Sequence, residues 1–175
     1  MYLFICENYK DRGTTDELVD ISLEAFIAES GFDADGSSRE ILRTEKGKPY
    51  FKELPVQFSV SHTGDVWVCL MTAGDKPVGV DIQAVRDYSY EKIAARYYTQ
   101  AEQRLVREHG ADEFFRIWTC KEAYAKYTGR GLGSYLKDAS TIYNKEVEFA
   151  EIKISDGIKG ACCIKEKKDL WVRMI

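Results

Sequence analysis

Residues 117–126 read Ile-Trp-Thr-Cys-Lys-Glu-Ala-Tyr-Ala-Lys and carry their apolar side chains at helical spacing. In a helix, Trp118, Glu122 and Lys126 lie at positions i, i+4 and i+8 and share one face, with Lys121 roughly 100° to one side. Two interpretations are open. A carboxylate between two ammonium groups suits phosphate chemistry with a metal ion. An ordinary exposed helix would gain only about 0.3 to 0.5 kcal/mol from a Glu122–Lys126 pair.

Upstream, residues 77–83 read Pro-Val-Gly-Val-Asp-Ile-Gln and alternate as a half-buried strand requires. The alternation places Gly79, Asp81 and Gln83 together on one face of that strand. Aspartate is depleted in strands, so the presence of Asp81 in this strand needs an explanation. Either the strand ends in a turn at this point, or Asp81 is a metal ligand beside a glycine that lets a ligand approach the backbone.

Residues 58–64, Phe-Ser-Val-Ser-His-Thr-Gly, predict a strand that runs into a small polar turn. Ser61 and His62 offer a hydroxyl and a ring nitrogen to an anion, although a lone histidine near a strand end is also a common structural residue. Before them, Gly-Lys-Pro-Tyr at residues 47–50 predicts a rigid turn with one positive charge, on Lys48.

In this order, the segments resemble the Sfp-type 4′-phosphopantetheinyl transferases. The matching blocks lie at residues 47–50, 59–64, 78–82, 96–102 (Arg-Tyr-Tyr-Thr-Gln-Ala-Glu) and 118–126, followed by a glycine turn at 129–132 (Gly-Arg-Gly-Leu). The resemblance is strong over about residues 40–136 and weak at both ends. Five blocks in register make chance a poor explanation.

The resemblance implies transfer of the phosphopantetheine arm of coenzyme A to a serine of an apo acyl or peptidyl carrier protein, with Mg²⁺ and release of 3′,5′-ADP. Asp81 and Glu122 match the two acidic metal-ligand positions of the family. Glu122 is also the candidate acceptor of the serine proton, and Lys121 and Lys126 are expected to neutralise phosphate oxygens. This chain departs from the family at Gln83, where a second acid is common; its amide oxygen can coordinate a metal or a metal-bound water but brings no charge.

For the coenzyme itself, Lys48 and His62 match positions that the family uses for the adenosine 3′-phosphate, and Ser61 is expected to contact the same ligand. Arg12 is a looser match, and a solvated loop charge is the other interpretation. Glu102 corresponds to another acidic position of the family, but it also ends a Thr-Gln-Ala-Glu capping box, so structure and function are both open there.

Composition agrees with this interpretation. The chain has 175 residues and a formal net charge of −4, which argues against a general nucleic-acid binder. Its five cysteines show no Cys-x-x-Cys spacing and only two histidines accompany them, so a zinc site is not expected. The amino terminus lacks the features of a signal peptide, and no apolar run approaches a membrane span. We expect a cytoplasmic monomer with reduced thiols and no membrane partner.

The expected fold class is α+β with antiparallel sheets. The resemblance implies the phosphopantetheinyl transferase fold: two pseudo-symmetric halves, residues 1–84 and 85–175, each a sheet packed with helix, in one compact unit with the active site between them. Periodicity predicts helices at 14–30, 89–97, 100–108 and 112–127, and strands at 2–6, 56–61, 66–72, 78–83, 140–144, 147–154, 158–165 and 170–175.

Two other classes of function compete. A catalytically silent coenzyme A or carrier-protein binding module is conceivable because of Gln83 and the short segment before residue 40. A different nucleotide enzyme is disfavoured because the chain lacks Gly-x-x-x-x-Gly-Lys-[Ser/Thr] and Gly-x-Gly-x-x-Gly motifs. The sequence does not indicate which carrier protein or pathway is served.

Overall fold

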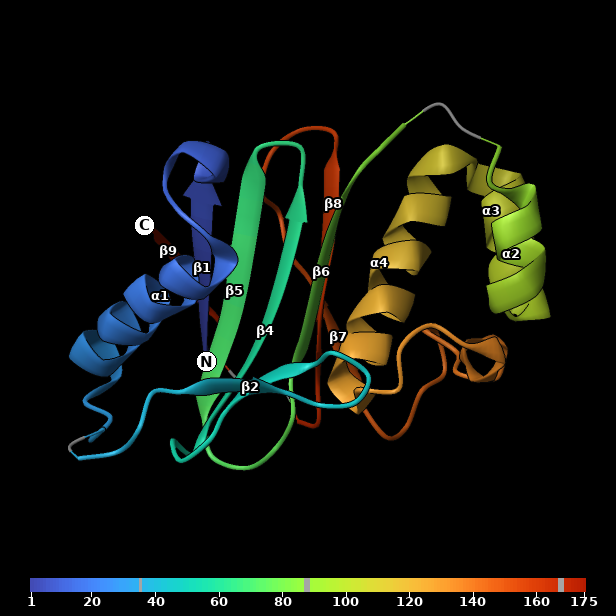
Figure 1. The fold of residues 1–175 in the computed structure, drawn as a ribbon. Helices are drawn as coiled ribbons and strands as arrows, with labels where there is room; N and C mark the ends of the chain where they lie inside the picture. Colours follow the sequence, from blue (N-terminus) through green and yellow to red (C-terminus); the bar gives the residue numbers. More distant parts are fainter. Residues whose placement is uncertain (35, 87–88, 167–168) are drawn as a thin grey trace.

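The computed structural model describes residues 1–34, 36–86, 89–166 and 169–175, and its layers run from helix α1 through two β-sheets to helix α4 (Figure 1). The helices are α1 (Thr15–Ser30), α2 (Glu91–Tyr97), α3 (Gln100–His109) and α4 (Ala111–Thr128), with short 3₁₀ turns η1 (Tyr9–Asp11) and η2 (Ser134–Lys137). The strands are β1 (Tyr2–Glu7), β2 (Ile41–Arg43), β3 (Pro49–Phe51), β4 (Val56–Thr63), β5 (Val66–Ala73), β6 (Gly79–Ala84), β7 (Glu148–Glu151), β8 (Ile158–Ile164) and β9 (Trp171–Met174).

Antiparallel pairing dominates the sheets. The first sheet has the order β4-β5-β1-β9, in which only the β1–β9 pair is parallel among the described strands. The second sheet has the antiparallel order β6-β8-β7, and β2 and β3 form a separate hairpin. The α+β prediction is therefore confirmed.

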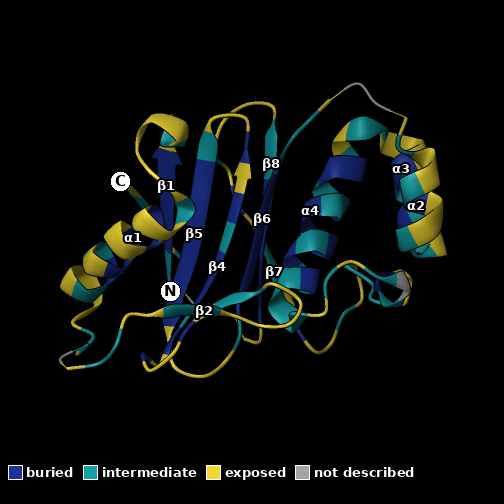
Figure 2. Cartoon of the chain, in the orientation of Figure 1, coloured by how far each residue is buried: buried dark blue, intermediate teal, exposed yellow. Residues whose placement is uncertain are grey.

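Period-two alternation along the strands divides the apolar side chains between two cores. In β1, Phe4 packs toward α1 with Leu23, whereas Leu3 packs toward the second sheet with Ile82. Both cores are buried, and burying apolar surface is worth about 25 cal/mol per Å². The first sheet therefore lies between α1 and the second sheet. Its central strands are coloured as buried in Figure 2.

Helix α4 packs directly on β6 because Gly79 has no side chain. A Cβ atom at Gly79 would lie 2.0 Å from the carbonyl oxygen of Ala123 and 2.7 Å from the backbone nitrogen of Tyr127. The absence of a side chain at Gly79 therefore allows the close approach of the helix. One interpretation of the sequence had assigned this role to the approach of a ligand. This contact places α4 over the strand face that carries Asp81.

The edge strands of the two sheets, β4 and β6, meet through side-chain hydroxyls. Ser59, Ser61 and Thr63 of β4 accept hydrogen bonds from successive outward N–H groups of β6 at 3.1, 3.2 and 3.1 Å. We call these three contacts the hydroxyl rungs. They join the first sheet to the strand that carries Asp81.

Most predicted elements are present within a few residues of their expected bounds, but the strand predicted at residues 140–144 is wrong. There, side chains bind nearby backbone in place of a partner strand: the Ser140 hydroxyl accepts from the N–H groups of Ile142 and Tyr143, and Asn144 Oδ1 accepts from the N–H of Glu146. The short strands β2 and β3 were not predicted. The division into halves stays a prediction, since β6 pairs with β8, and β9 with β1, across residue 84.

Candidate functional site

Asp81 lies on β6 facing α4, and its carboxylate is held at one oxygen only. Ser61 Oγ donates to Asp81 Oδ1 at 2.7 Å, and Lys126 Nζ of α4 reaches the same oxygen at 2.7 Å. The Asp81 side chain is only 8% exposed. Its second oxygen, Oδ2, is buried and has no partner among the described residues. A buried carboxylate oxygen without a partner is costly, so this oxygen has the capacity to bind a further group.

Glu122 lies one helical turn before Lys126 on the same face of α4. Burial raises the pKa of Glu122 to about 7, the nearby charge of Asp81 raises it further, and Lys126 opposes both. Two carboxylates that share a partly buried space repel each other until a cation joins them. We call Asp81, Glu122 and Lys126 the pocket cluster.

The pocket cluster lines a cavity of about 380 Å³ at the edge of β4. Ser61 and His62 of β4 and Thr15, in the first turn of α1, complete much of its wall. A second cavity of about 250 Å³ shares Glu122 and Lys126 and extends toward the hairpin turn that carries Lys48. The acid and the lysine of α4 therefore stand where two cavities meet.

The residues present fit a hard divalent cation. Mg²⁺ prefers carboxylate oxygens and keeps several water ligands, so it needs only one or two protein carboxylates. Asp81 Oδ2 and the Glu122 carboxyl are the oxygens that would hold it. The described part of the chain contains no cluster of three or more His, Cys, Asp or Glu side chains suited to a metal.

Lys121, although adjacent to Glu122, points away from the cavity. Its side chain is 0% exposed, and its Nζ donates to the carbonyls of Leu136 and Ala139 at 2.7 and 2.6 Å and pairs with Glu102 at 2.9 Å. An ammonium group has three hydrogens, and all three are used. The prediction that Lys121 binds phosphate is therefore wrong: it ties α4 to the chain that follows it.

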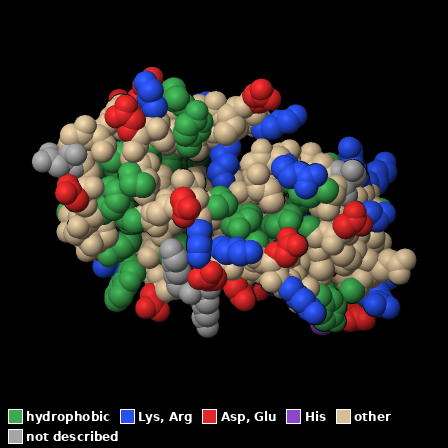
Figure 3. All heavy atoms as spheres, turned by 90° about the horizontal axis from the view of Figure 1, so that it is seen from below, with side chains coloured by type: hydrophobic (Ala, Val, Ile, Leu, Met, Phe, Trp, Pro, Cys, Tyr) green, Lys and Arg blue, Asp and Glu red, His purple; other side chains and the backbone are tan. Residues whose placement is uncertain are grey.

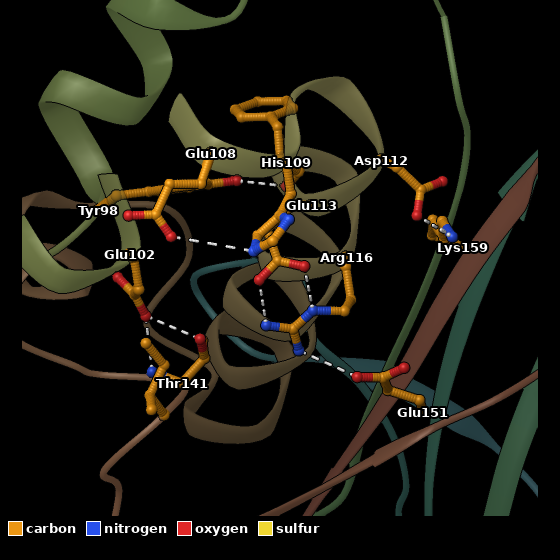
Figure 4. A network of polar contacts seen from close by, with 12 residues as sticks. Tyr98, Glu102, Glu108, His109, Asp112, Glu113, Arg116, Thr141, Glu151 and Lys159 are labelled. Atoms are coloured by element: carbon orange, nitrogen blue, oxygen red, sulfur yellow. Dashed lines mark hydrogen bonds and ion pairs between the residues drawn. The ribbon is translucent and has the colours of Figure 1, made fainter. Parts of the chain in front are cut away.

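Glu102, the acidic partner of Lys121, also contacts Thr141 (Figure 4). One oxygen accepts from the N–H and hydroxyl of Thr141 at 2.7 and 2.8 Å, and the other accepts from the N–H of Thr99 in the capping box at 2.7 Å. Burial alone would raise the pKa of Glu102, but Lys121 and these donors hold it below its usual value. We call Glu102, Lys121 and Thr141 the buried cluster; it resolves the open interpretation of Glu102 in favour of structure.

The remaining predicted residues differ in placement. Lys48 Nζ donates to the carbonyls of Tyr127 and Val78 at 3.0 and 3.3 Å, and burial lowers its pKa to about 8. His62 is exposed at the cavity wall beside the Tyr9 ring. Arg12 is exposed just before α1. Gln83 shares the strand face of Asp81 but is not among the described residues that line either cavity.

Sequence reasoning missed Thr15 as part of the cavity wall. The capping box of Thr14 and Glu17 correctly indicated where α1 begins. Nothing in the sequence indicated that this end of the helix lies against the edge of β4. That arrangement depends on the packing of α1 across the first sheet.

Comparison with known proteins fits this geometry. The sequence model described as the 4′-phosphopantetheinyl transferase superfamily matches residues 77–171, a range that contains Asp81, Glu122 and Lys126. The chain belongs to this superfamily. The match spans β6 and α4, the two elements that carry the pocket cluster.

This phosphopantetheinyl transferase family member is similar to several curated transferases, three of them from bacilli. A 4′-phosphopantetheinyl transferase of Bacillus subtilis is 32% identical over 118 residues, which cover 65% of this chain and 51% of that protein. The psf-1 transferase of Bacillus pumilus is 34% identical over 122 residues, covering 66% and 51%. Sfp of Bacillus subtilis strain 168 is 28% identical over 153 residues, covering 85% and 66%. The chain thus spans about half to two thirds of the length of these relatives.

Two further features concern the apolar character of the helices and the distribution of charge on one face. Within the described residues, no helix has the length and apolar character needed to cross a membrane. On the face seen in Figure 3, Lys and Arg side chains are interspersed with acidic and hydrophobic ones. That face therefore lacks the continuous basic surface that general nucleic-acid binding needs.

Proposed function

We propose that this protein transfers the 4′-phosphopantetheine arm of coenzyme A to a serine hydroxyl of an apo acyl or peptidyl carrier protein. The serine oxygen forms a bond to the β-phosphorus, the bond from that phosphorus to the bridging oxygen breaks, and 3′,5′-ADP leaves. The observation that carries the proposal is the pocket cluster itself. In a member of this superfamily, two carboxylates and a lysine line a cavity, and Asp81 Oδ2 is unpaired within the described parts of the chain.

Each residue of the pocket cluster has a task in this reaction. Asp81 and Glu122 would hold a Mg²⁺ ion, which would neutralise the pyrophosphate and the charge that grows on the leaving phosphate. Lys126 uses one hydrogen on Asp81 Oδ1 and has two left for phosphate oxygens. Glu122 is also the group that would accept the serine proton, directly or through a water.

The donor's nucleotide extends from the pocket cluster along the cavity walls. His62 lines the cavity that contains Asp81, and Lys48 lines the cavity on the other side of Glu122. We expect both residues to contact the adenosine 3′-phosphate. Lys48 Nζ donates to two carbonyls, and an ammonium group has three hydrogens. Arg12 would contribute to the same phosphate, and Gln83, on the strand face of Asp81, would hold a water near the metal.

The broader setting of the proposal is a cytoplasmic monomer made of two halves, residues 1–84 and 85–175. Five buried free cysteines support a reducing compartment, because a disulfide-stabilised protein would use them. A silent coenzyme A or carrier-protein binding module is the alternative. The acid–lysine constellation beside the two cavities favours the enzyme, since transfer needs a group that can accept the serine proton and coenzyme A binding does not.

Intact-mass spectrometry of apo carrier proteins tests the proposal. Carriers from fatty acid, polyketide and nonribosomal peptide systems are incubated with the protein, coenzyme A and Mg²⁺. We expect at least one carrier to gain one phosphopantetheine group, with an equal amount of 3′,5′-ADP, and its serine-to-alanine variant to gain nothing. Coenzyme A binding without any mass gain across the carriers would favour the silent module.

A further inference from the structure

The three hydroxyl rungs between β4 and β6 are alike in their backbone contacts, but one of them does more. Ser59, Ser61 and Thr63 alternate along β4 and are all buried. Each hydroxyl oxygen accepts a hydrogen bond from one backbone N–H of β6, in the order Val80, Ile82 and Ala84. The rungs take the place of a backbone ladder between two edge strands.

Only the middle rung touches an ionisable side chain. Ser61 Oγ accepts from the N–H of Ile82 at 3.2 Å and donates to Asp81 Oδ1 at 2.7 Å. A serine hydroxyl has a single proton, so its donor capacity is committed to the carboxylate while the Ile82 contact fixes the oxygen. The hydroxyl that was expected to contact the coenzyme is therefore already occupied.

The contacts of Asp81 divide its two oxygens into a fixed one and an open one. Oδ1 receives Ser61 and Lys126, both at 2.7 Å, whereas Oδ2 is buried and has no partner in the described part of the protein. Lys126 is 31% exposed at the end of a long flexible side chain. Ser61 is short, buried and anchored to the backbone, so it is the rigid constraint on the carboxylate plane.

We propose that Ser61 is a positioning residue: it fixes Asp81 through Oδ1 so that Oδ2 is presented to the divalent cation. The inference rests on the proposed function, because it deepens the role of the same carboxylate. It assigns Ser61 to the orientation of a metal ligand and removes it from the set that contacts coenzyme A. Loss of a group that orients a ligand typically weakens metal affinity by about 10- to 100-fold.

The chain supplies its own control for this proposal. Thr63→Val removes a rung hydroxyl of the same kind, which contacts the backbone N–H of Ala84 and no carboxylate. Ser61→Ala removes the rung and the contact with Asp81. Ser61→Thr keeps a hydroxyl of the type that already works as a rung at position 63, and it serves as the rescue variant.

The experiment measures cation binding without turnover. Mn²⁺ is titrated into each protein with coenzyme A and no carrier protein, and free Mn²⁺ is followed by electron paramagnetic resonance; thermal unfolding is recorded in parallel. We expect Ser61→Ala to raise the Mn²⁺ dissociation constant about tenfold, and Thr63→Val to change it less than about twofold, at similar losses of melting temperature. Ser61→Thr should restore affinity to within about threefold of the original protein.

The outcomes separate this inference from the proposed function. Equal Mn²⁺ affinity in Ser61→Ala and the original protein would overturn the positioning role while leaving the metal site and the transferase intact. Equal weakening in Ser61→Ala and Thr63→Val would also overturn it, because the rungs would then act only through stability. Absence of saturable Mn²⁺ binding in the original protein would overturn the metal assignment and the positioning role together.

Discussion

Two acid–lysine clusters lie on neighbouring faces of α4, and they differ in how completely their polar atoms are paired. In the buried cluster, Glu102 and Lys121 are 0% exposed and every hydrogen of the ammonium group has an acceptor. In the pocket cluster, one oxygen of Asp81 has no partner among the residues that the structure describes, and Glu122 has a raised pKa. A saturated cluster has no capacity left for a ligand, whereas an incomplete one next to a cavity does.

Breaking the buried cluster should have the largest effect, on stability. Lys121→Met leaves the Glu102 carboxylate buried without its charge partner, and we expect the free energy of unfolding to fall by about 3 to 5 kcal/mol. Urea denaturation measures it. Lys159→Met is the matched control, since Lys159 pairs with Asp112 near the surface at 2.7 Å and its loss should cost about 1 kcal/mol or less. Equal small losses in both variants would show that the buried pair is not structural.

Breaking the pocket cluster should abolish transfer with little effect on folding. Asp81→Ala and Glu122→Ala each remove a charged group directed at the phosphates, and each should reduce the transfer rate by at least about 10²-fold. Rates are measured at saturating coenzyme A and Mg²⁺, with circular dichroism as the check on folding. A folded variant that keeps a near-normal rate would remove that residue from the metal site.

A smaller effect is expected at Lys48, outside both clusters. Lys48→Ala should weaken the binding of coenzyme A more than the binding of 3′-dephospho-coenzyme A. The difference in binding free energy should be roughly 1.5 to 3 kcal/mol, for the lost charged contact. Arg12→Ala should act in the same direction and more weakly, because Arg12 is exposed. Titration calorimetry with both donors measures the difference. Equal losses for the two donors would mean that Lys48 acts only through its contacts with the carbonyls of Tyr127 and Val78.

The smallest expected effect is a pH dependence that also comes from Lys48. Burial lowers its pKa from 10.5 to about 8, so between these values the unfolded chain holds more protons than the folded protein. Stability contributed at this position therefore rises as the pH increases through that window. The free energy of unfolding, measured at several pH values, should increase with pH more in the original protein than in Lys48→Met. A difference that is flat or falls with pH would contradict the lowered pKa.

The sequence predicted the elements of the site well because each has a clear local signal. Alternation placed Asp81 on a strand and helical spacing placed Glu122 and Lys126 on one helix face, and the structure confirms both placements. The capping box of Glu102 was equally local and is present. These elements are joined by the packing of α4 on Gly79, which is a tertiary contact. The glycine itself was the only sign of that contact in the sequence.

The distinction between Lys121 and Lys126 was beyond the sequence. Both lysines flank Glu122 on one helix. Helical periodicity shows only that Lys121 lies to one side of the face that carries Glu122 and Lys126. Its burial depends on the chain after α4, where the carbonyls of Leu136 and Ala139 fold back onto the helix. The strand wrongly predicted at 140–144 follows directly after this segment, and there side chains bind nearby backbone in place of a partner strand.

The central claim is that the pocket cluster carries out transfer while the buried cluster holds the fold, and a paired measurement on Glu122→Gln and Glu102→Gln tests it most directly. Both substitutions remove one carboxylate charge and preserve shape. Transfer rate per folded molecule and free energy of unfolding are measured for each. We predict a loss of transfer at nearly unchanged stability for Glu122→Gln, and a loss of stability with transfer within about tenfold of normal for Glu102→Gln. The reverse pattern, or the same pattern in both variants, would contradict the account.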